Sequence, residues 1–275
     1  MPELPEVETI RTGLEPALVG RRFERVDIRD PRLTRPFDPE PVAAELEGER
    51  VGAVERRGKY LIVRFESGRV LLVHLRMTGS FLHVVAGDSS GDDPYARSVV
   101  KLDDGSDVIY LDVRRFGTWL LLEPGQLDSY LEPRVGAELL VGGRPAPALA
   151  KRLAGRRAPI KALLLDQRLF AGVGNIYADE ALWWARIHPL RPGGELGAGE
   201  IQELVRGVRR ALRTGIARQG STLSEYRGPD GAPGRMQHEF RVYGRASEPC
   251  SRCGTPIEKT RAGGRGTWYC PGCQT

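Results

Sequence analysis

The sequence has no long apolar run and no cysteine before its last two dozen or so residues. No run approaches the ~20 apolar residues of a membrane-spanning helix, which excludes a protein held by such a helix. The first eight residues are acidic and lack the basic and apolar regions of a secretory signal, so we expect none. With cysteine confined to one place, nothing indicates an oxidising compartment. We therefore expect a cytoplasmic protein with no membrane partner.

The four cysteines form two pairs near the C-terminus, each with two residues between its members: Cys250, Cys253, Cys270 and Cys273. Two such pairs can wrap four thiolates around one ion, and this spacing is typical of a zinc ribbon. A closed all-thiolate site predicts one structural Zn²⁺ rather than a catalytic metal. Two local redox motifs or two disulfides are the alternative, but the spacing between the pairs and the lack of a βαβ pattern favour zinc.

The segment that contains these cysteines is basic. Residues 235–275 hold seven Arg or Lys against three Glu, a net of +4 out of the whole chain's +5, in a stretch too short to build a core. A basic surface presented on a small metal-bound module predicts a polyanionic partner. Composition alone is equally compatible with arginines that only keep the module soluble.

Hydrophobic periodicity changes twice along the chain, whose 275 residues suffice for one sizeable core or two modest ones. Apolar residues at helical spacing predict a helix over 5–19, ended by Gly20. From Arg22 to about Leu122 the pattern has period two or short β-rich runs, and it predicts an antiparallel β-sandwich. The expected strands are 23–28, 51–55, 60–65, 70–75, 98–102, 108–113 and 118–122.

Residues 123–147 are rich in proline and glycine and predict a linker. Beyond them the pattern is helical, and two of the expected helices are joined by a tight turn at 171–174 that contains two glycines. Such a turn lets the backbone approach a ligand closely, and helix amides behind an Asn175 cap suit a phosphate. An ordinary packing joint is the simpler interpretation of this turn taken alone. The expected helices are 148–153, 160–170, 175–185 and 199–219.

Seven short motifs lie in order along the chain, at residues 2–9, 57–61, 74–79, 112–117, 165–167, 172–180 and 264–270. Each is weak alone, but the ordered set resembles the formamidopyrimidine-DNA glycosylase family. The resemblance implies an α+β multidomain fold. Its parts are an N-terminal helix with an antiparallel β-sandwich (2–122), a linker (123–147), a helix-two-turns-helix domain with a damaged-base loop (148–234), and a four-cysteine zinc finger (235–275).

The resemblance implies that Pro2 is the nucleophile, once Met1 is removed, and that Glu3 donates and accepts protons at the sugar. The pKa of such an amine lies nearer the α-amino value of ~8 than the ~10.4 of lysine, so more of it is free at neutral pH. Condensation with the sugar C1′ gives a cationic iminium, which drives elimination of the strand phosphates. Glu6 is expected to support the site. Without the resemblance, both acids are simple first-turn residues that the helix dipole favours.

A base inside a duplex cannot present its glycosidic bond, so the lesion nucleotide must be flipped out and the gap filled. The resemblance implies Met77 as an apolar plug, Arg114 facing the widowed base and Phe116 as a wedge. Apolar residues of these types are usually core residues, but their places beside glycines and in matching motifs favour the surface role. The remaining matches, all to phosphate-contacting residues, are Lys59 near the reacting sugar, Asn175 in the helical turn and Arg265 in the finger.

Residues 221–245 resemble the family's damaged-base loop, and the turn residues at 229–234 are typical of a mobile lid. The stretch 235–238 departs from the aromatic-containing versions, so the sequence identifies no base-specific hydrogen bond there. His238 is as compatible with a plain surface position as with ligand binding.

The sequence therefore predicts a monomeric DNA glycosylase with lyase activity that removes oxidised purines, such as 8-oxoguanine and formamidopyrimidines. Its partner is duplex DNA with oxidised bases or abasic sites, and the strand is cut by β,δ-elimination. An endonuclease VIII-like enzyme for oxidised pyrimidines is the alternative within the class, but the N-terminus, Met77 and the Arg114/Phe116 pair favour the purine enzyme. A damage-binding protein of the same fold, which binds lesions without covalent chemistry, is the alternative from another class.

Overall fold

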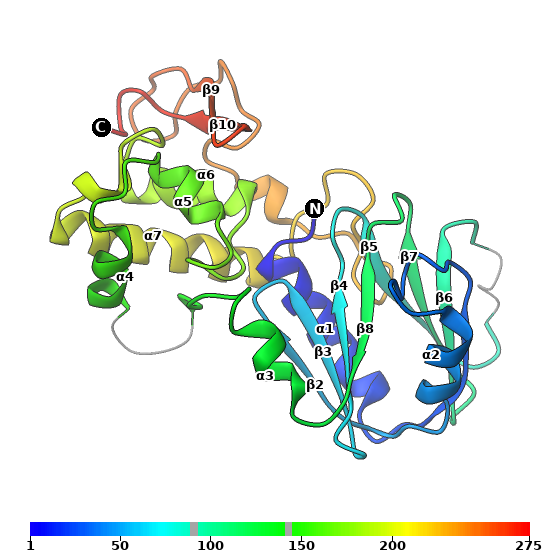
Figure 1. Ribbon diagram of the computed structural model, residues 1–275. Helices are drawn as coiled ribbons and strands as arrows, with labels where there is room; N and C mark the ends of the chain where they lie inside the picture. The colour runs from blue at the N-terminus through cyan, green and yellow to red at the C-terminus, as the bar shows by residue number, and fades with distance from the viewer. Residues whose placement is uncertain (89–92, 141–144) are drawn as a thin grey trace. The chain divides into compact units, whose positions relative to one another are not determined.

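The computed structural model describes residues 1–88, 93–140 and 145–275, which fold into two compact units (Figure 1). The first unit consists of Met1–Glu132 with Arg218–Arg235, and the second of Pro133–Ala217 with Met236–Thr275. Each unit is thus built from two stretches of chain. The segment Arg218–Arg235, expected at the end of the helical domain, instead packs with the β-rich first unit.

The first unit begins with α1 (Leu4–Leu18), within one residue of the predicted bounds. A proline in its first turn and a capping box between Glu3 and Glu6 start the helix. The predicted stop at Gly20 is confirmed, because this glycine adopts a φ of 82°. The helix buries one apolar face in the core of the unit, formed by Val7, Ile10, Leu14 and Leu18.

Among the described residues of this unit, eight strands form two four-stranded antiparallel sheets, which confirms the predicted antiparallel sandwich and adds one strand to the seven expected. The strand order is β1-β6-β7-β5 in one sheet and β2-β3-β4-β8 in the other. The apolar face of α1 shares one core with residues of both sheets, among them Phe23, Leu61 and Trp119. The strands are β1 (Phe23–Ile28), β2 (Val51–Arg57), β3 (Tyr60–Phe65), β4 (Val70–His74), β5 (Gly79–Val84), β6 (Ala96–Leu102), β7 (Asp107–Asp112) and β8 (Thr118–Leu122).

Three elements of this unit were not predicted: β5, α2 (Pro39–Leu46) and α3 (Gln126–Leu131). The short helix α2 carries a proline in its first turn and buries only Val42 and Leu46, so its amphipathic signal is brief. The helix α3 lies inside the predicted linker 123–147, which is therefore not wholly irregular. Residues 141–144 of that linker lie outside the described residues.

The second unit is mainly helical, with α4 (Ala146–Leu153), α5 (Ile160–Leu165), α6 (Asn175–Ala185) and α7 (Ala198–Ala217), and with the 3-10 turns η1 (Gly193–Glu195) and η2 (Met236–Glu239). The helix α5 ends five residues earlier than expected, because the N–H groups of Leu169 and Phe170 turn back to the Asp166 carbonyl at 2.9 Å. Close packing of α6 on α7 needs Gly207, where an added Cβ would lie 2.4 Å from the Ala181 carbonyl oxygen. Among the described residues, no helix has the length and apolar character needed to cross a membrane.

The C-terminal part of this unit contains one hairpin, β9 (Glu258–Ala262) and β10 (Arg265–Tyr269), which the sequence did not predict. Its two-residue turn consists of Gly263 and Gly264, with φ angles of 55° and 75°. A tight hairpin turn of this kind needs positive φ at both positions, which glycine adopts without strain. The turn places Arg265 at the start of β10, paired with Ala262.

Candidate functional site

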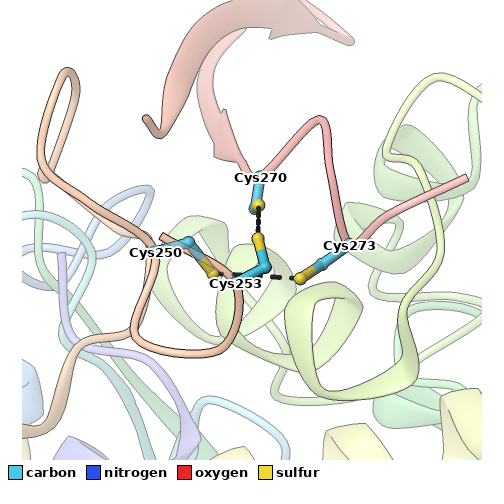
Figure 2. A group of neighbouring side chains, drawn as sticks. All are labelled: Cys250, Cys253, Cys270 and Cys273. Carbon is cyan, nitrogen blue, oxygen red and sulfur yellow. Dashed lines mark hydrogen bonds between the residues drawn. The ribbon is translucent and has the colours of Figure 1, made fainter. Parts of the chain in front are cut away.

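Four thiols of the second unit point toward one another, as Figure 2 shows. The Sγ atoms of Cys250 and Cys273 are 3.9 Å apart, those of Cys253 and Cys270 are 3.4 Å apart, and all four lie within 4.8 Å of one another. Four sulfurs at about 2.3 Å from one tetrahedral zinc would be separated by roughly 3.8 Å, so the observed spacing fits this ion. The cluster is a closed site for one structural Zn²⁺, as predicted.

The surroundings of the thiols support a metal-bound thiolate set. The indole Nε1–H of Trp183 and the backbone N–H of Arg252 both donate to Cys250 Sγ, at 3.3 and 3.4 Å. Donors of this kind stabilise and orient metal-bound thiolates. The backbone N–H of Cys270 donates to Gln274 Oε1 at 2.8 Å, and the Gln274 amide donates to the Ile187 carbonyl at 3.0 Å. The metal centre is thus attached to the end of α6 at two points.

The hairpin β9–β10 is held against helices α5 and α6 by a buried ion pair. Lys161 and Asp179, both 0% exposed, are joined at 2.8 Å. The Lys161 ammonium also donates to the Gly266 carbonyl and the Thr267 hydroxyl, each at 2.8 Å, while the Trp268 N–H donates to Asp179 Oδ2 at 3.1 Å. Burial raises the pKa of Asp179 to about 7, while the Lys161 charge acts in the opposite direction. Breaking such a pair leaves one charge buried alone, so the hairpin is firmly placed.

Asn175 lies at the first position of α6, and the N-cap is Gly174, so the expected Asn175 cap is wrong. Its side-chain amide instead donates to the Gly266 carbonyl at 3.1 Å, next to Arg265. The preceding turn is closed by Gln167, which donates to the Val173 carbonyl at 2.7 Å and accepts from the Gly172 N–H at 2.9 Å. Turn, helix start and finger hairpin therefore form one hydrogen-bonded group. Arg265 itself is exposed at its edge.

The segment that leads into the finger is fixed by one carboxylate. Glu180, 1% exposed, accepts the backbone N–H groups of Arg241, Val242 and Tyr243 at 2.9 to 3.0 Å. Burial raises the pKa of Glu180, while these three donors favour its charged form. Sequence motifs included Glu180 but gave no indication of this role.

In the first unit, Pro2 and Glu3 are buried at the start of α1, with Glu3 as its N-cap residue. Glu6, 2% exposed, accepts the backbone N–H of Glu3 at 2.9 Å through one oxygen and that of Ser221 at 2.8 Å through the other. One carboxylate therefore connects the N-terminal residues to the loop 221–245. The supporting role expected for Glu6 at the reacting sugar stays a prediction.

The beginning of that loop is packed tightly on Glu6. Gly220 has a φ of 79°, and an added Cβ there would lie 2.8 Å from the Glu6 Cγ. The Tyr226 hydroxyl donates to the Glu6 carbonyl at 3.3 Å, and burial raises the pKa of this phenol. Further along the loop, an added Cβ on Gly234 would lie 2.4 Å from the Gly220 carbonyl oxygen. The loop therefore returns on itself beside the N-terminus.

Met77 lies in the turn between β4 and β5, and Arg114 and Phe116 lie in the turn between β7 and β8. Met77 is half-buried, whereas Arg114 and Phe116 are exposed and Phe116 retains 51% of its surface. The Arg114 guanidinium lies 5.0 Å from the Phe116 ring centroid. Arg115, between them, forms a bidentate pair with Asp30 at 2.5 and 2.8 Å, which lowers the pKa of that carboxyl. The interpretation of Phe116 as a core residue is thus excluded.

Lys59 follows Gly58 in the turn between β2 and β3, and it is only 6% exposed. His74 ends the neighbouring strand β4, with its ring 4.7 Å from that of Tyr60. Its Nδ1 accepts the Arg76 N–H at 3.0 Å, just before Met77. Burial, with the nearby charges of Arg76 and Lys59, lowers the pKa of His74 to about 3, so the imidazole is neutral at physiological pH.

His74→Gln is expected to make the protein less sensitive to acid. The pKa of His74 lies near 3 in the folded state against an ordinary 6.5, so between these values the unfolded chain binds one proton more. The neutral His74 side chain therefore contributes fully to the free energy of unfolding above pH 6.5, and this contribution falls as the pH drops. Between pH 7 and pH 5, urea unfolding should show the wild type losing about 2 kcal/mol more than the variant. His83→Gln, on β5, is the control, and equal losses in all three proteins would contradict the assignment.

The fold and the metal centre define a zinc-finger protein in which a β-sandwich is joined to a helix-two-turns-helix body. Family models match this chain in the same order: the formamidopyrimidine-DNA glycosylase N-terminal domain at residues 1–119, the H2TH domain of that family at 136–227, and a zinc finger found in FPG and IleRS at 247–275. The chain belongs to the formamidopyrimidine-DNA glycosylase family.

Individual relatives agree along the whole length. The formamidopyrimidine-DNA glycosylase of Symbiobacterium thermophilum is 47% identical and covers 100% of this chain and 89% of its own length. The Lactococcus lactis Fpg, solved in complex with a Fapy-dG containing DNA, is 36% identical with a TM-score of 0.90, covering 99% of this chain and 100% of its own. The same protein with an oxidized pyrimidine containing DNA is 37% identical, also with a TM-score of 0.90, and covers 100% of both chains.

Proposed function

We propose that this protein is a base-excision repair DNA glycosylase that removes oxidised purines from duplex DNA and then cuts the strand as a lyase. The observation that carries the proposal is the match of all three family domains, in order, within one chain that begins Pro2-Glu3 at the start of a helix. Its place of action is DNA, and we propose the bacterial cytoplasm and nucleoid as its location.

The proposed chemistry begins at the Pro2 nitrogen, which becomes a secondary amine when Met1 is removed. Pro2 lies directly before Glu3, the N-cap residue of α1. The amine attacks C1′ as the damaged base departs, and the C1′–O4′ bond then breaks, with Glu3 transferring protons at the sugar, so that a cationic iminium forms. The iminium then withdraws electrons, so that loss of a C2′ proton expels the 3′ phosphate and a second elimination expels the 5′ phosphate.

The other residues divide between filling the gap and holding the strand. Met77, Arg114 and Phe116 replace the flipped nucleotide in the stack, since two of them are exposed and the third is half-buried in turns. Lys59, Asn175 and Arg265 contact phosphates, which position the protein without reading the sequence. Zinc acts only through the fold, by holding the finger that presents Arg265.

Two alternatives differ from this proposal in measurable ways. An enzyme for oxidised pyrimidines would prefer those lesions in a panel of duplexes, and Lactococcus lactis Fpg has been solved with an oxidised pyrimidine as well as with Fapy-dG. A damage-binding protein would bind all of them and excise none. The N-terminal Pro2-Glu3 pair favours an enzyme over a binding protein, because neither residue is needed for binding alone.

Borohydride trapping tests the proposal directly. The mature protein is incubated with a duplex that has 8-oxoguanine opposite cytosine, and sodium borohydride reduces any iminium. One covalent complex is expected, and its peptide should map to the N-terminus without Met1. A trap that maps to Lys59, or the absence of any trap, would remove Pro2 from the role. A stronger trap with an oxidised pyrimidine would favour the alternative substrate.

Arg265→Ala is expected to weaken binding of damaged and undamaged duplexes alike. The side chain is exposed at the hairpin end that Lys161 and Asn175 hold in place. Neutralising one phosphate contributes about 0.9 to the slope of log affinity against log salt, and about tenfold in affinity at 0.1 M salt. Fluorescence anisotropy from 0.05 to 0.4 M salt should show a slope flatter by about one, with zinc content unchanged.

Arg261→Ala is the matched control for Arg265, because Arg261 is an exposed arginine on the other strand of the same hairpin. A general charge effect would change both variants equally. An unchanged salt slope for Arg265→Ala, or a loss limited to lesion preference, would exclude Arg265 as a phosphate contact.

A further inference from the structure

The carboxylate of Asp112 joins the two turns that carry the proposed gap-filling residues. Asp112 ends β7 and is 1% exposed. Its Oδ1 accepts the hydroxyl of Thr78 at 2.5 Å, in the turn that contains Met77. Its Oδ2 accepts the backbone N–H of Gly117 at 2.7 Å, directly after Phe116. Each oxygen thus holds a different turn.

A third hydrogen bond links the two turns to each other. The backbone N–H of Arg114 donates to the Thr78 hydroxyl oxygen at 2.9 Å. Because Thr78 accepts this bond, its single hydroxyl proton is free to donate to Asp112, and the carboxylate accepts it as a charged group. The chain of bonds Arg114–Thr78–Asp112–Gly117 therefore starts and ends in the β7–β8 turn and passes through the β4–β5 turn.

Close packing under both turns leaves little room for other arrangements. An added Cβ on Gly79 would lie 2.3 Å from the Tyr110 hydroxyl, and one on Gly117 would lie 1.8 Å from the same oxygen. Tyr110 is 0% exposed and packs on Trp119 at 5.7 Å between ring centroids. The backbone of Asp112 is held as well, since its carbonyl accepts the Arg97 Nε–H at 2.8 Å.

We propose that Asp112 is a positioning residue that fixes Met77 relative to Arg114 and Phe116 before DNA is bound. Its carboxylate keeps the two turns ordered in the free protein, so they do not have to become ordered when DNA binds. This preorganisation lowers the entropy cost of filling the gap. Asp112 itself does not contact the reacting sugar in this scheme. The inference rests on the proposed function, because it gives the two turns their role in the duplex.

The scheme predicts a difference between double-stranded and single-stranded substrates. A single strand has no opposite base and no continuous stack, so it offers no gap to fill. Thr78→Val removes the bridging hydroxyl at nearly constant shape, and Asp112→Asn removes the charge and one acceptor. Both variants should excise 8-oxoguanine from a duplex about 10- to 100-fold more slowly. Both should cleave an abasic site in a single strand within about twofold of the wild type.

Two matched variants serve as controls. Thr78→Ser keeps the hydroxyl and should restore duplex activity, and Asp107→Asn, at the other end of β7, should leave it unchanged. A second readout does not need chemistry: 2-aminopurine beside a tetrahydrofuran abasic analogue becomes brighter when the protein unstacks the duplex. Thr78→Val should lower this increase in proportion to its loss of excision.

The outcomes separate the two proposals. Equal losses on duplex and single strand, with a lower melting temperature, would reduce Asp112 to a structural residue and overturn the positioning role. Unchanged duplex excision and fluorescence in Thr78→Val would overturn it too. A wild type that excises nothing would refute the proposed function alone, since the fluorescence comparison still decides whether Asp112 and Thr78 position the turns.

Discussion

Glu3→Gln is expected to bind a lesion duplex with nearly wild-type affinity and to lose base excision by about 10²- to 10⁴-fold. Glutamine keeps the shape and the oxygen needed at the start of α1, where Glu3 and Glu6 form a capping box, so the helix should remain intact. Its amide, unlike a carboxyl group, cannot act as a general acid or base at the sugar. Single-turnover excision of 8-oxoguanine, measured beside equilibrium binding, separates these two effects.

The matched control is Glu15→Gln, which removes a carboxyl at the exposed end of the same helix, where Glu15 pairs with Arg11 at 2.9 Å. It should excise at the wild-type rate. Pro2→Gly, which replaces the secondary amine by a primary one, should reduce excision more than binding. A Glu3→Gln enzyme that excises normally, or one that fails mainly in binding, would show that Glu3 only caps the helix.

Local sequence patterns predicted most of the fold because apolar residues recur at regular spacing and glycine or proline residues mark where elements end. The helix α6 was predicted with its observed bounds, since Gly174 precedes it and its apolar pattern is continuous. Helix α2 was missed because eight residues with two buried positions give little periodic signal. Strand β5 was missed because its burial does not alternate: its first three residues, Gly79, Ser80 and Phe81, are all buried.

Sequence motifs name single residues of the proposed site, but they do not give the hydrogen bonds that connect these residues. Motifs identify Asp112, Gln167, Asp179 and Glu180 as part of a pattern, yet each acts on backbone groups that lie far away in sequence or are formed by a turn. Glu6 accepts the Ser221 N–H across 215 positions, which no local pattern encodes. This contact, together with the His83 N–H that donates to the Pro229 carbonyl at 2.8 Å, is among those that join residues 218–235 to the first unit. The cysteine spacing, in contrast, does predict which residues come together, because one ion binds all four thiolates.

Loss of one zinc ligand should remove the metal and the finger together. Cys250→Ser is expected to lower bound zinc from one equivalent to about none, because structural zinc contributes about 10 to 16 kcal/mol to folding of such small modules. Few apolar residues are buried around the thiols, with Trp183, Val242 and Ile257 as the main ones, so this cluster cannot replace the metal. Duplex affinity should fall at least about tenfold at 0.1 M salt, since the Arg265 contact is lost.

The first unit should survive this change, because its core is built from α1 and the two sheets and contains none of the four cysteines. Elemental analysis for zinc, anisotropy for DNA and near-ultraviolet circular dichroism for the packing of the sandwich aromatics give the three readouts. Ser251→Ala, between the paired thiols, is the control and should retain one zinc and normal binding. Retained zinc with normal strand cleavage in Cys250→Ser would contradict a closed four-thiolate site. Unfolding of the whole chain would instead show that the finger stabilises both units.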